Sequence, residues 1–198
     1  MATVSRNLFY PENQTNKTCN GCHAGDTPAA QVARDAGIKL HVWTNIRMAS
    51  NTSNVIAEDP SMDFRLFPDS LQRDAAGNLL PCWDGFSMNP DTRVGSFGKF
   101  QLKRIQTWVT KFNLDGIFLD FYGDTTDVDA SRHYYQFPFY PMQVAEIEWA
   151  KSIASWAHKN GKYLIINCPE ASMAVQHLAD LVTCDSNGVL REYLHQNS

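Results

Sequence analysis

The stretch LDGIFLDFYGD, residues 114–124, decides the expected fold. The pair Asp115-Gly116 is a turn signal, and the apolar run IFL that follows it has the length and composition of a short buried strand. Asp120 comes directly after that run, so a carboxylate is expected where the strand leaves the core. On position alone, Asp120 is either a functional group or a residue that caps the next loop or pairs with an arginine.

Amphipathic segments alternate with apolar runs on both sides of this stretch. Their spacing predicts helices at 27–36, 97–112 and 141–160, and strands at 38–44, 117–120, 163–167 and 181–184. Helices that alternate with strands in this way predict parallel βα units, so the expected fold class is α/β. His41 falls inside a predicted strand and is expected to be a core histidine with its hydrogen bonds satisfied.

Polar residues follow the predicted strands at their carboxyl ends. Asp120, Glu170 and Asp185 each lie at or just beyond such an end. Asn45, Arg47 and Asn167 also lie there and supply hydrogen-bonding groups. Because ligands of parallel α/β sheets bind beyond the carboxyl ends of the strands, these six residues are predicted to share one site.

Two long connections carry further candidates. Residues 48–95 are rich in Pro and Gly and lack helix periodicity, which predicts an ordered loop packed over the end of the sheet. Within it, Trp83 and Asp84 place an aromatic ring beside a carboxylate. Residues 123–141 combine acids with aromatic rings and suit a carbohydrate platform. The competing interpretation of both segments is a solvated loop whose acids cap turns.

Composition excludes several classes of protein. The chain has 198 residues and a net charge of -4, with no cluster of Lys or Arg, so nucleic acid is not an expected partner. No apolar run is long enough to span a membrane. The expected organisation is one domain, 1–198, with an irregular segment 1–26 before the βα units at 27–198. No signal peptide is recognisable in the sequence as given, and the cellular location is left open between secreted, if a leader was removed, and cytoplasmic otherwise.

The irregular segment contains Cys19-Asn-Gly-Cys22-His23. Cys-x-x-Cys-His is the pattern of covalent haem c attachment, and the same residues would form half of a zinc site. Neither a second axial ligand nor the missing zinc ligands can be assigned from spacing. The expectation is therefore no cofactor, with haem or zinc at Cys19, Cys22 and His23 as the alternatives.

The series GNLLPCWDGFSMNP, LDGIFLDFYGD, GKYLIINCPE and ADLVTCDS resembles the TIM-barrel glycoside-hydrolase-like proteins, in the group around the alpha-galactosidases and related glycosidases. The resemblance covers residues 38–185 and implies a (β/α) barrel that acts on carbohydrate. It implies Asp120 as the nucleophile, with Asp185 or Glu170 as the acid/base. Asn45, Arg47, Trp83, Asp84, Tyr122 and Asn167 would then orient the sugar.

A complete barrel of this kind takes about 250 residues. The sequence predicts four strands and at most one more before residue 27, so a partial barrel is expected. An unclosed sheet would leave strand edges exposed, which predicts self-association. The expected function is a glycoside hydrolase that uses paired carboxylates, with two alternatives: a non-catalytic carbohydrate-binding or assembly module, and a c-type haem protein.

Overall fold

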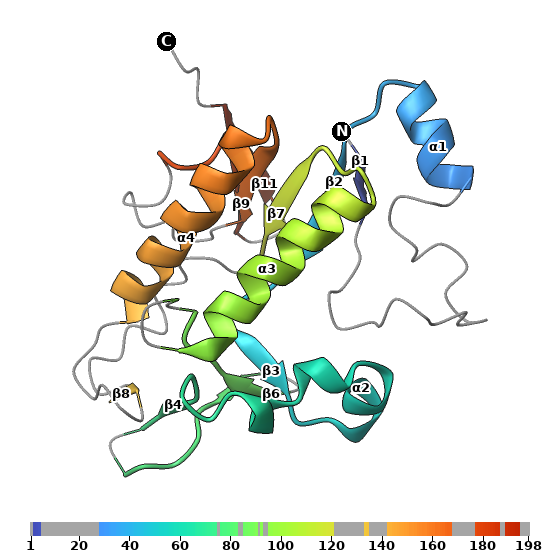
Figure 1. Cartoon of the computed structure of the whole chain (residues 1–198). Coiled ribbons are helices and arrows are strands. Elements are labelled where there is room, and N and C mark those ends of the chain that lie inside the picture. The colour runs from blue at the N-terminus through green and yellow to red at the C-terminus, as the bar shows by residue number, and fades with distance from the viewer. Residues whose placement is uncertain are drawn as a thin grey trace.

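The fold was analysed in a computed structural model of the chain (Figure 1). The structure describes residues 2–4, 28–74, 76–82, 85–90, 92, 95–120, 133–134, 142–167, 177–186 and 189–194. The helices are α1 Pro28–Asp35, α2 Ser53–Glu58, α3 Ser96–Lys111 and α4 Met142–Lys159, with short 3-10 helices η1 Pro60–Met62 and η2 Phe64–Leu66. The strands are β1 Ala2–Val4, β2 Leu40–Thr44, β3 Met48–Ser50, β4 Gln72–Arg73, β5 Pro81–Cys82, β6 Gly85–Ser87, β7 Gly116–Leu119, β8 His133–Tyr134, β9 Tyr163–Asn167, β10 Leu181–Ser186 and β11 Val189–Leu194.

The main sheet has six strands in the order β1-β2-β7-β9-β10-β11. Strands β1, β2, β7, β9 and β10 run parallel to one another. Strand β11 runs antiparallel to β10 and forms a hairpin with it. The spatial order follows the chain order and does not reverse, unlike a doubly wound sheet. This is the winding of a (β/α) barrel wall, and the described strands form an open sheet rather than a closed barrel.

Helices α3 and α4 cover one face of this sheet (Figure 1). Right-handed crossovers place both helices on the same side, because the strand order never reverses. The main core lies between them and the sheet: Ile105, Trp108, Trp149 and Ile153 of the helices pack with the apolar side chains of the strands. The strand residues in this core are Leu40, Val42, Ile117, Leu119, Leu164, Ile166 and Val182.

Alternate residues of the same strands belong to the opposite face. The register aligns Trp43 with Phe118, Phe118 with Ile165, and Ile165 with Leu181, which forms one apolar row across four strands. None of these four residues belongs to the helix-side core. In a closed barrel, this is the face whose side chains fill the interior.

Residues 48–90 fold into a small unit of their own, which corrects the prediction of a loop. Strands β3, β6 and β5 form an antiparallel sheet, and α2, η1 and η2 complete the unit. It shares a separate core with α3, in which Met62 and Met88 of the unit and Phe97 of α3 are fully buried. Strands of two or three residues are too short to produce a readable alternation in the sequence, so periodicity missed them.

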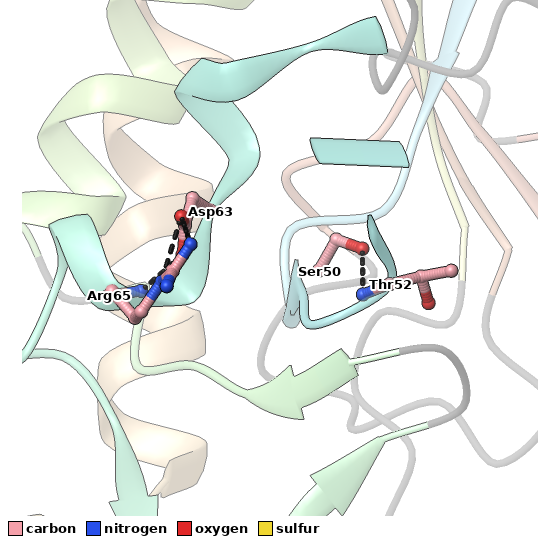
Figure 2. Close-up of polar contacts among 4 residues, drawn as sticks. All are labelled: Ser50, Thr52, Asp63 and Arg65. Atoms are coloured by element: carbon pink, nitrogen blue, oxygen red, sulfur yellow. Dashed lines mark hydrogen bonds and ion pairs between the residues drawn. The ribbon is translucent and has the colours of Figure 1, made fainter. Parts of the chain in front are cut away.

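Local polar contacts fix the backbone of this unit (Figure 2). Asp63 caps η2 by accepting from the backbone N–H of Arg65 at 2.9 Å, and it also accepts from Nε and Nη2 of the same arginine. The Arg65 guanidinium holds the pKa of the Asp63 carboxyl below its ordinary value. Ser50 Oγ accepts from the backbone N–H of Thr52 at 3.1 Å and ends β3 in a turn.

The small unit caps the amino end of α3. Asp69 Oδ2 accepts from the backbone N–H of Ser96 at 3.0 Å, and Ser70 Oγ accepts from that of Phe97 at 3.1 Å. The N-cap position of α3 is Gly95, which has no side chain to bond the backbone. The carboxylate of Asp69 supplies both the hydrogen bond and the negative charge that a helix amino terminus favours.

Gly98 allows α3 to approach the small unit closely. A Cβ built there would lie 1.7 Å from the carbonyl oxygen of Pro90, a backbone atom that cannot move aside cheaply. We expect Gly98→Ala to lower the free energy of unfolding in urea, although alanine favours helix by about 1 kcal/mol over glycine. An unchanged or increased value would contradict this close contact.

Candidate active site at the carboxyl ends of the parallel strands

Three polar side chains from neighbouring strands meet at one edge of the sheet. Asp120 follows β7 and is 7% exposed, Asn167 ends β9 and is 8% exposed, and Thr183 lies in β10 and is 5% exposed. Asn167 Nδ2 donates to Asp120 Oδ1 at 2.7 Å. Thr183 Oγ1 donates to Asn167 Oδ1 at 3.2 Å. Thr183 thus fixes the orientation of the Asn167 amide, and that amide fixes the orientation of the Asp120 carboxylate.

The register explains why these residues meet. Leu119 pairs with Ile166, and Asn167 pairs with Thr183, so the three polar residues form the row beyond the apolar one. The backbone N–H of Asp120 donates to the carbonyl of Thr44 at 2.9 Å, which ties the end of β7 to the end of β2. Asp120 and Asn167 therefore lie together at the carboxyl ends of their strands, and their role in a shared site stays a prediction.

Asn45 and Arg47 follow β2 and are both 4% exposed. Asn45 Oδ1 accepts from the backbone N–H of Arg47 at 2.8 Å, so Asn45 shapes its own turn. Arg47 Nε lies 3.4 Å from Glu146 Oε1 of α4, and both side chains are 5% exposed. Loss of either partner from such a pair leaves a buried charge uncompensated.

Of the other predicted residues, only Asp185 lies in the part of the chain that the structure describes. Trp83, Asp84, Tyr122, Glu170, Cys19, Cys22 and His23 lie outside the described residues. Asp185 was predicted to follow a strand ending at residue 184, but β10 continues to Ser186, and Asp185 pairs with Leu190 in the hairpin. Asp185 therefore belongs to the strand itself, two residues beyond Thr183.

Sequence reasoning missed Thr183 and Glu146. Thr183 lies two residues before Asp185 in the same strand, and the alternation of strand side chains could have assigned it to the same face. Glu146 carries no such signal, because a glutamate in an amphipathic helix ordinarily faces water. Its burial follows from the position of Arg47 across the interface, which only the tertiary structure reveals.

No group of three or more His, Cys, Asp or Glu side chains within the described ranges could hold a metal ion. Haem or zinc binding by residues 19–23 stays a prediction, because that segment lies outside these ranges. Among the helices that the structure describes, none is long and apolar enough to cross a membrane.

His41 lies near the amino end of β2, whereas Asp120 follows the carboxyl end of the neighbouring strand β7. The His41 side chain is fully buried, as predicted, but neither ring nitrogen has a hydrogen-bond partner among the residues described here. The expectation of a satisfied histidine is therefore wrong within this part of the chain. Its neighbour Gly116 leaves room for the ring, since a Cβ there would lie 2.5 Å from His41 Cδ2. Burial lowers the pKa of His41.

This burial makes stability pH-dependent. The unfolded chain takes up a proton near the ordinary histidine pKa of 6.5, while the buried ring resists protonation. The stability is therefore fully present above that pH and is lost as the pH falls, by at most about 1.4 kcal/mol per pH unit. We expect His41→Leu to flatten urea unfolding free energies between about pH 7.5 and 5.5, and His177→Gln, at an exposed position, to leave the slope unchanged. A slope that survives in His41→Leu would assign it to other groups.

No protein-family model matches this chain, and no curated protein matches it. Solved structures do resemble it. The cycloalternan-degrading enzyme from Trueperella pyogenes in complex with isomaltose aligns with a TM-score of 0.53 and 10% identity over 77% of this chain and 22% of that chain. A maltogenic alpha-amylase from Thermotoga neapolitana aligns with a TM-score of 0.48 and 13% identity over 77% of this chain and 29% of that chain. A sulfoquinovosidase from E. rectale aligns with a TM-score of 0.49 and 14% identity over 77% of this chain and 22% of that chain.

At 10% identity, the similarity to the T. pyogenes enzyme concerns the fold alone and assigns no family. The chain spans less than a third of the length of each of these three structures. The T. pyogenes enzyme, with a TM-score of 0.53, supports the α/β barrel-like architecture expected from the sequence.

Proposed function

We propose that the carboxyl edge of the parallel sheet is a glycosidase active site in which Asp120 is a catalytic carboxylate. The observation that carries the proposal is the buried row Asp120, Asn167 and Thr183, in which each side chain orients the next. Asp120 accepts a hydrogen bond from an amide 47 residues away in the chain, at the carboxyl ends of the parallel strands, where barrel enzymes hold their reacting groups.

Glycoside cleavage needs two carboxyl groups on opposite sides of the bond. In our proposal Asp120 is the nucleophile, and either Asp185 or Glu170 protonates the leaving oxygen. Asp185 is favoured by its strand, since it lies two residues beyond Thr183, which belongs to the row. Asn45, Arg47, Trp83, Asp84 and Tyr122 would contact the sugar, and Asn167 would position Asp120.

Carbohydrate is the proposed substrate class. Support comes from the T. pyogenes enzyme, whose structure was solved in complex with isomaltose. Of the three structures reported above, it has the highest TM-score with this chain. We therefore propose O-glycosidic bonds of oligosaccharides as the point of attack.

A second candidate is a non-catalytic carbohydrate-binding or assembly module. The observation in its favour is the open sheet, whose edge strands β1 and β11 do not pair with each other in the part of the chain described. A site with walls on only some sides can bind a sugar without excluding water from the reacting bond. In this case, we propose that self-association, measured by analytical ultracentrifugation, covers the open edges.

The test separates the two candidates. Release of glucose from isomaltose, and release of nitrophenol from a panel of 4-nitrophenyl glycosides, would be measured for the wild type and for Asp120→Asn. Hydrolysis by the wild type that is lost in Asp120→Asn, with sugar binding retained by calorimetry, supports the enzyme. Binding without hydrolysis in both proteins supports the module, and unchanged hydrolysis in Asp120→Asn would contradict the role of Asp120.

A further inference from the structure

A cavity of about 440 Å³ lies between the small unit and the exposed side of α3. It is lined by Asp59, Ser61, Phe100, Lys103, Arg104, Thr107 and Trp108. It shares no residue with the row at Asp120. We propose that this cavity binds a small organic molecule in which one carboxylate is attached to a ring. The proposal is independent of glycosidase activity.

The first step concerns the pair Arg104 and Asp59, whose side chains are 10% and 7% exposed. Arg104 donates to Asp59 Oδ2 and, at 3.0 Å, to Ser61 Oγ. Asp59 Oδ1 accepts from the backbone N–H and the hydroxyl of Ser61 at 3.2 and 2.5 Å. The two charges cancel, and both oxygens of the carboxylate are already occupied. Asp59 therefore has little capacity left to accept from a ligand hydroxyl.

The second step concerns Lys103, which is exposed at the rim. Its ammonium group has no ion-pair partner within the described ranges, so the wall carries one uncompensated positive charge. The hydroxyl of Thr107 uses its hydrogen to bond the carbonyl of Lys103 at 2.8 Å. The rim thus offers a charged donor, and a matching ligand brings a negatively charged acceptor.

The third step concerns the apolar wall. Phe100 and Trp108 hold the guanidinium of Arg104, whose carbon lies 5.5 and 5.8 Å from their ring centroids. Trp108 is 3% exposed, so it forms the floor of the cavity rather than a free stacking surface, while Phe100 is half-buried. A bare inorganic anion would leave this wall in contact with water. A ring that carries the carboxylate covers it, and either a uronic acid or an aromatic acid has that chemistry.

The test compares ligands that differ in one group. D-Glucuronate and D-glucose share a ring but only the first carries a carboxylate, and benzoate carries the carboxylate on an aromatic ring. Each is titrated into ¹⁵N-labelled protein while the amide signals of Ser61, Lys103 and Thr107 and the indole signal of Trp108 are followed. We expect glucuronate or benzoate to shift these signals with saturation, and glucose to shift them little. Which of the two acids binds identifies the source of the carboxylate.

Lys103→Met keeps the length of the side chain and removes its charge. Because Lys103 is exposed, the fold should be unaffected, and the dissociation constant of the acid should rise about fivefold or more. Lys159→Met, an exposed lysine of α4 far along the chain, is the matched control and should leave affinity unchanged. Binding should also weaken as NaCl is added.

The absence of saturable shifts with either acid would overturn the proposal. So would equal binding of glucose and glucuronate, or unchanged acid affinity in Lys103→Met. Equal binding of inorganic phosphate and the organic acids would also contradict it, because the apolar wall would then contribute nothing.

Discussion

Asp120→Asn is expected to lower kcat for glycoside hydrolysis by about 10³-fold or more, with little change in the affinity for the sugar. Asparagine has the shape of aspartate, and its carbonyl oxygen can still accept the hydrogen bond from Asn167 Nδ2 that now measures 2.7 Å. The substitution therefore removes the charge and nucleophilicity of the carboxylate while it keeps the packing of a side chain that is 7% exposed. Stopped assays with the most active nitrophenyl glycoside give kcat, and calorimetry gives affinity.

Asp115→Asn is the matched control for this experiment. Asp115 precedes β7 at the opposite end of the strand, where it bonds Lys39 Nζ at 3.1 Å and the backbone N–H of Leu40 at 2.9 Å. Burial alone would raise the pKa of the Asp115 carboxyl, but these two hydrogen bonds outweigh it and leave the pKa lowered. Asp115→Asn should cost stability at neutral pH and leave kcat unchanged. Equal loss of kcat in both variants would attribute the effect to the sheet rather than to Asp120.

The parallel sheet could be predicted because its strands carry strong local signals. The strand at residues 163–167 was predicted with the bounds that β9 has, and the two long helices were predicted to within a residue or two at each end. In each case an apolar run or an amphipathic face of full length specifies the element without reference to its neighbours. The hairpin of β10 and β11 was missed, because the polar residues Asp185 and Ser186 interrupt the apolar pattern while β11 holds them in the sheet.

The candidate site could be predicted only as far as strand ends determine it. Asp120 and Asn167 were found because they follow apolar runs directly. Their alignment with Thr183 depends on the register of three strands, and register is set by the packing of the whole sheet. The pairing of Arg47 with Glu146 joins residues 99 positions apart, and the capping of α3 by Asp69 joins residues 27 apart. Such contacts between distant segments leave no periodic trace in the sequence.

The second large effect is expected from Trp149, which joins α4 to α3 in the core. It is fully buried in the core between sheet and helices, and its Nε1 donates to the carbonyl of Gly98 at 3.0 Å. Gly98 lies in the first turn of α3 against Pro90 of the small unit. Glu146, three residues before Trp149 on α4, forms an ion pair with Arg47. One face of α4 therefore holds both the small unit and the end of β2 in place.

Trp149→Ala should lower the free energy of unfolding by about 3–5 kcal/mol, because a large cavity opens and few neighbours can fill it. Trp149→Phe keeps most of the volume and removes the indole N–H, and should cost about 1 kcal/mol. Trp156→Ala, on the same helix but only partly buried, is the control and should cost clearly less than Trp149→Ala. Urea denaturation at neutral pH provides all three values. Equal losses for the two alanine variants would mean that Trp149 has no special place in the core, and the link from α4 to the site would then rest on the ion pair of Glu146 with Arg47 alone.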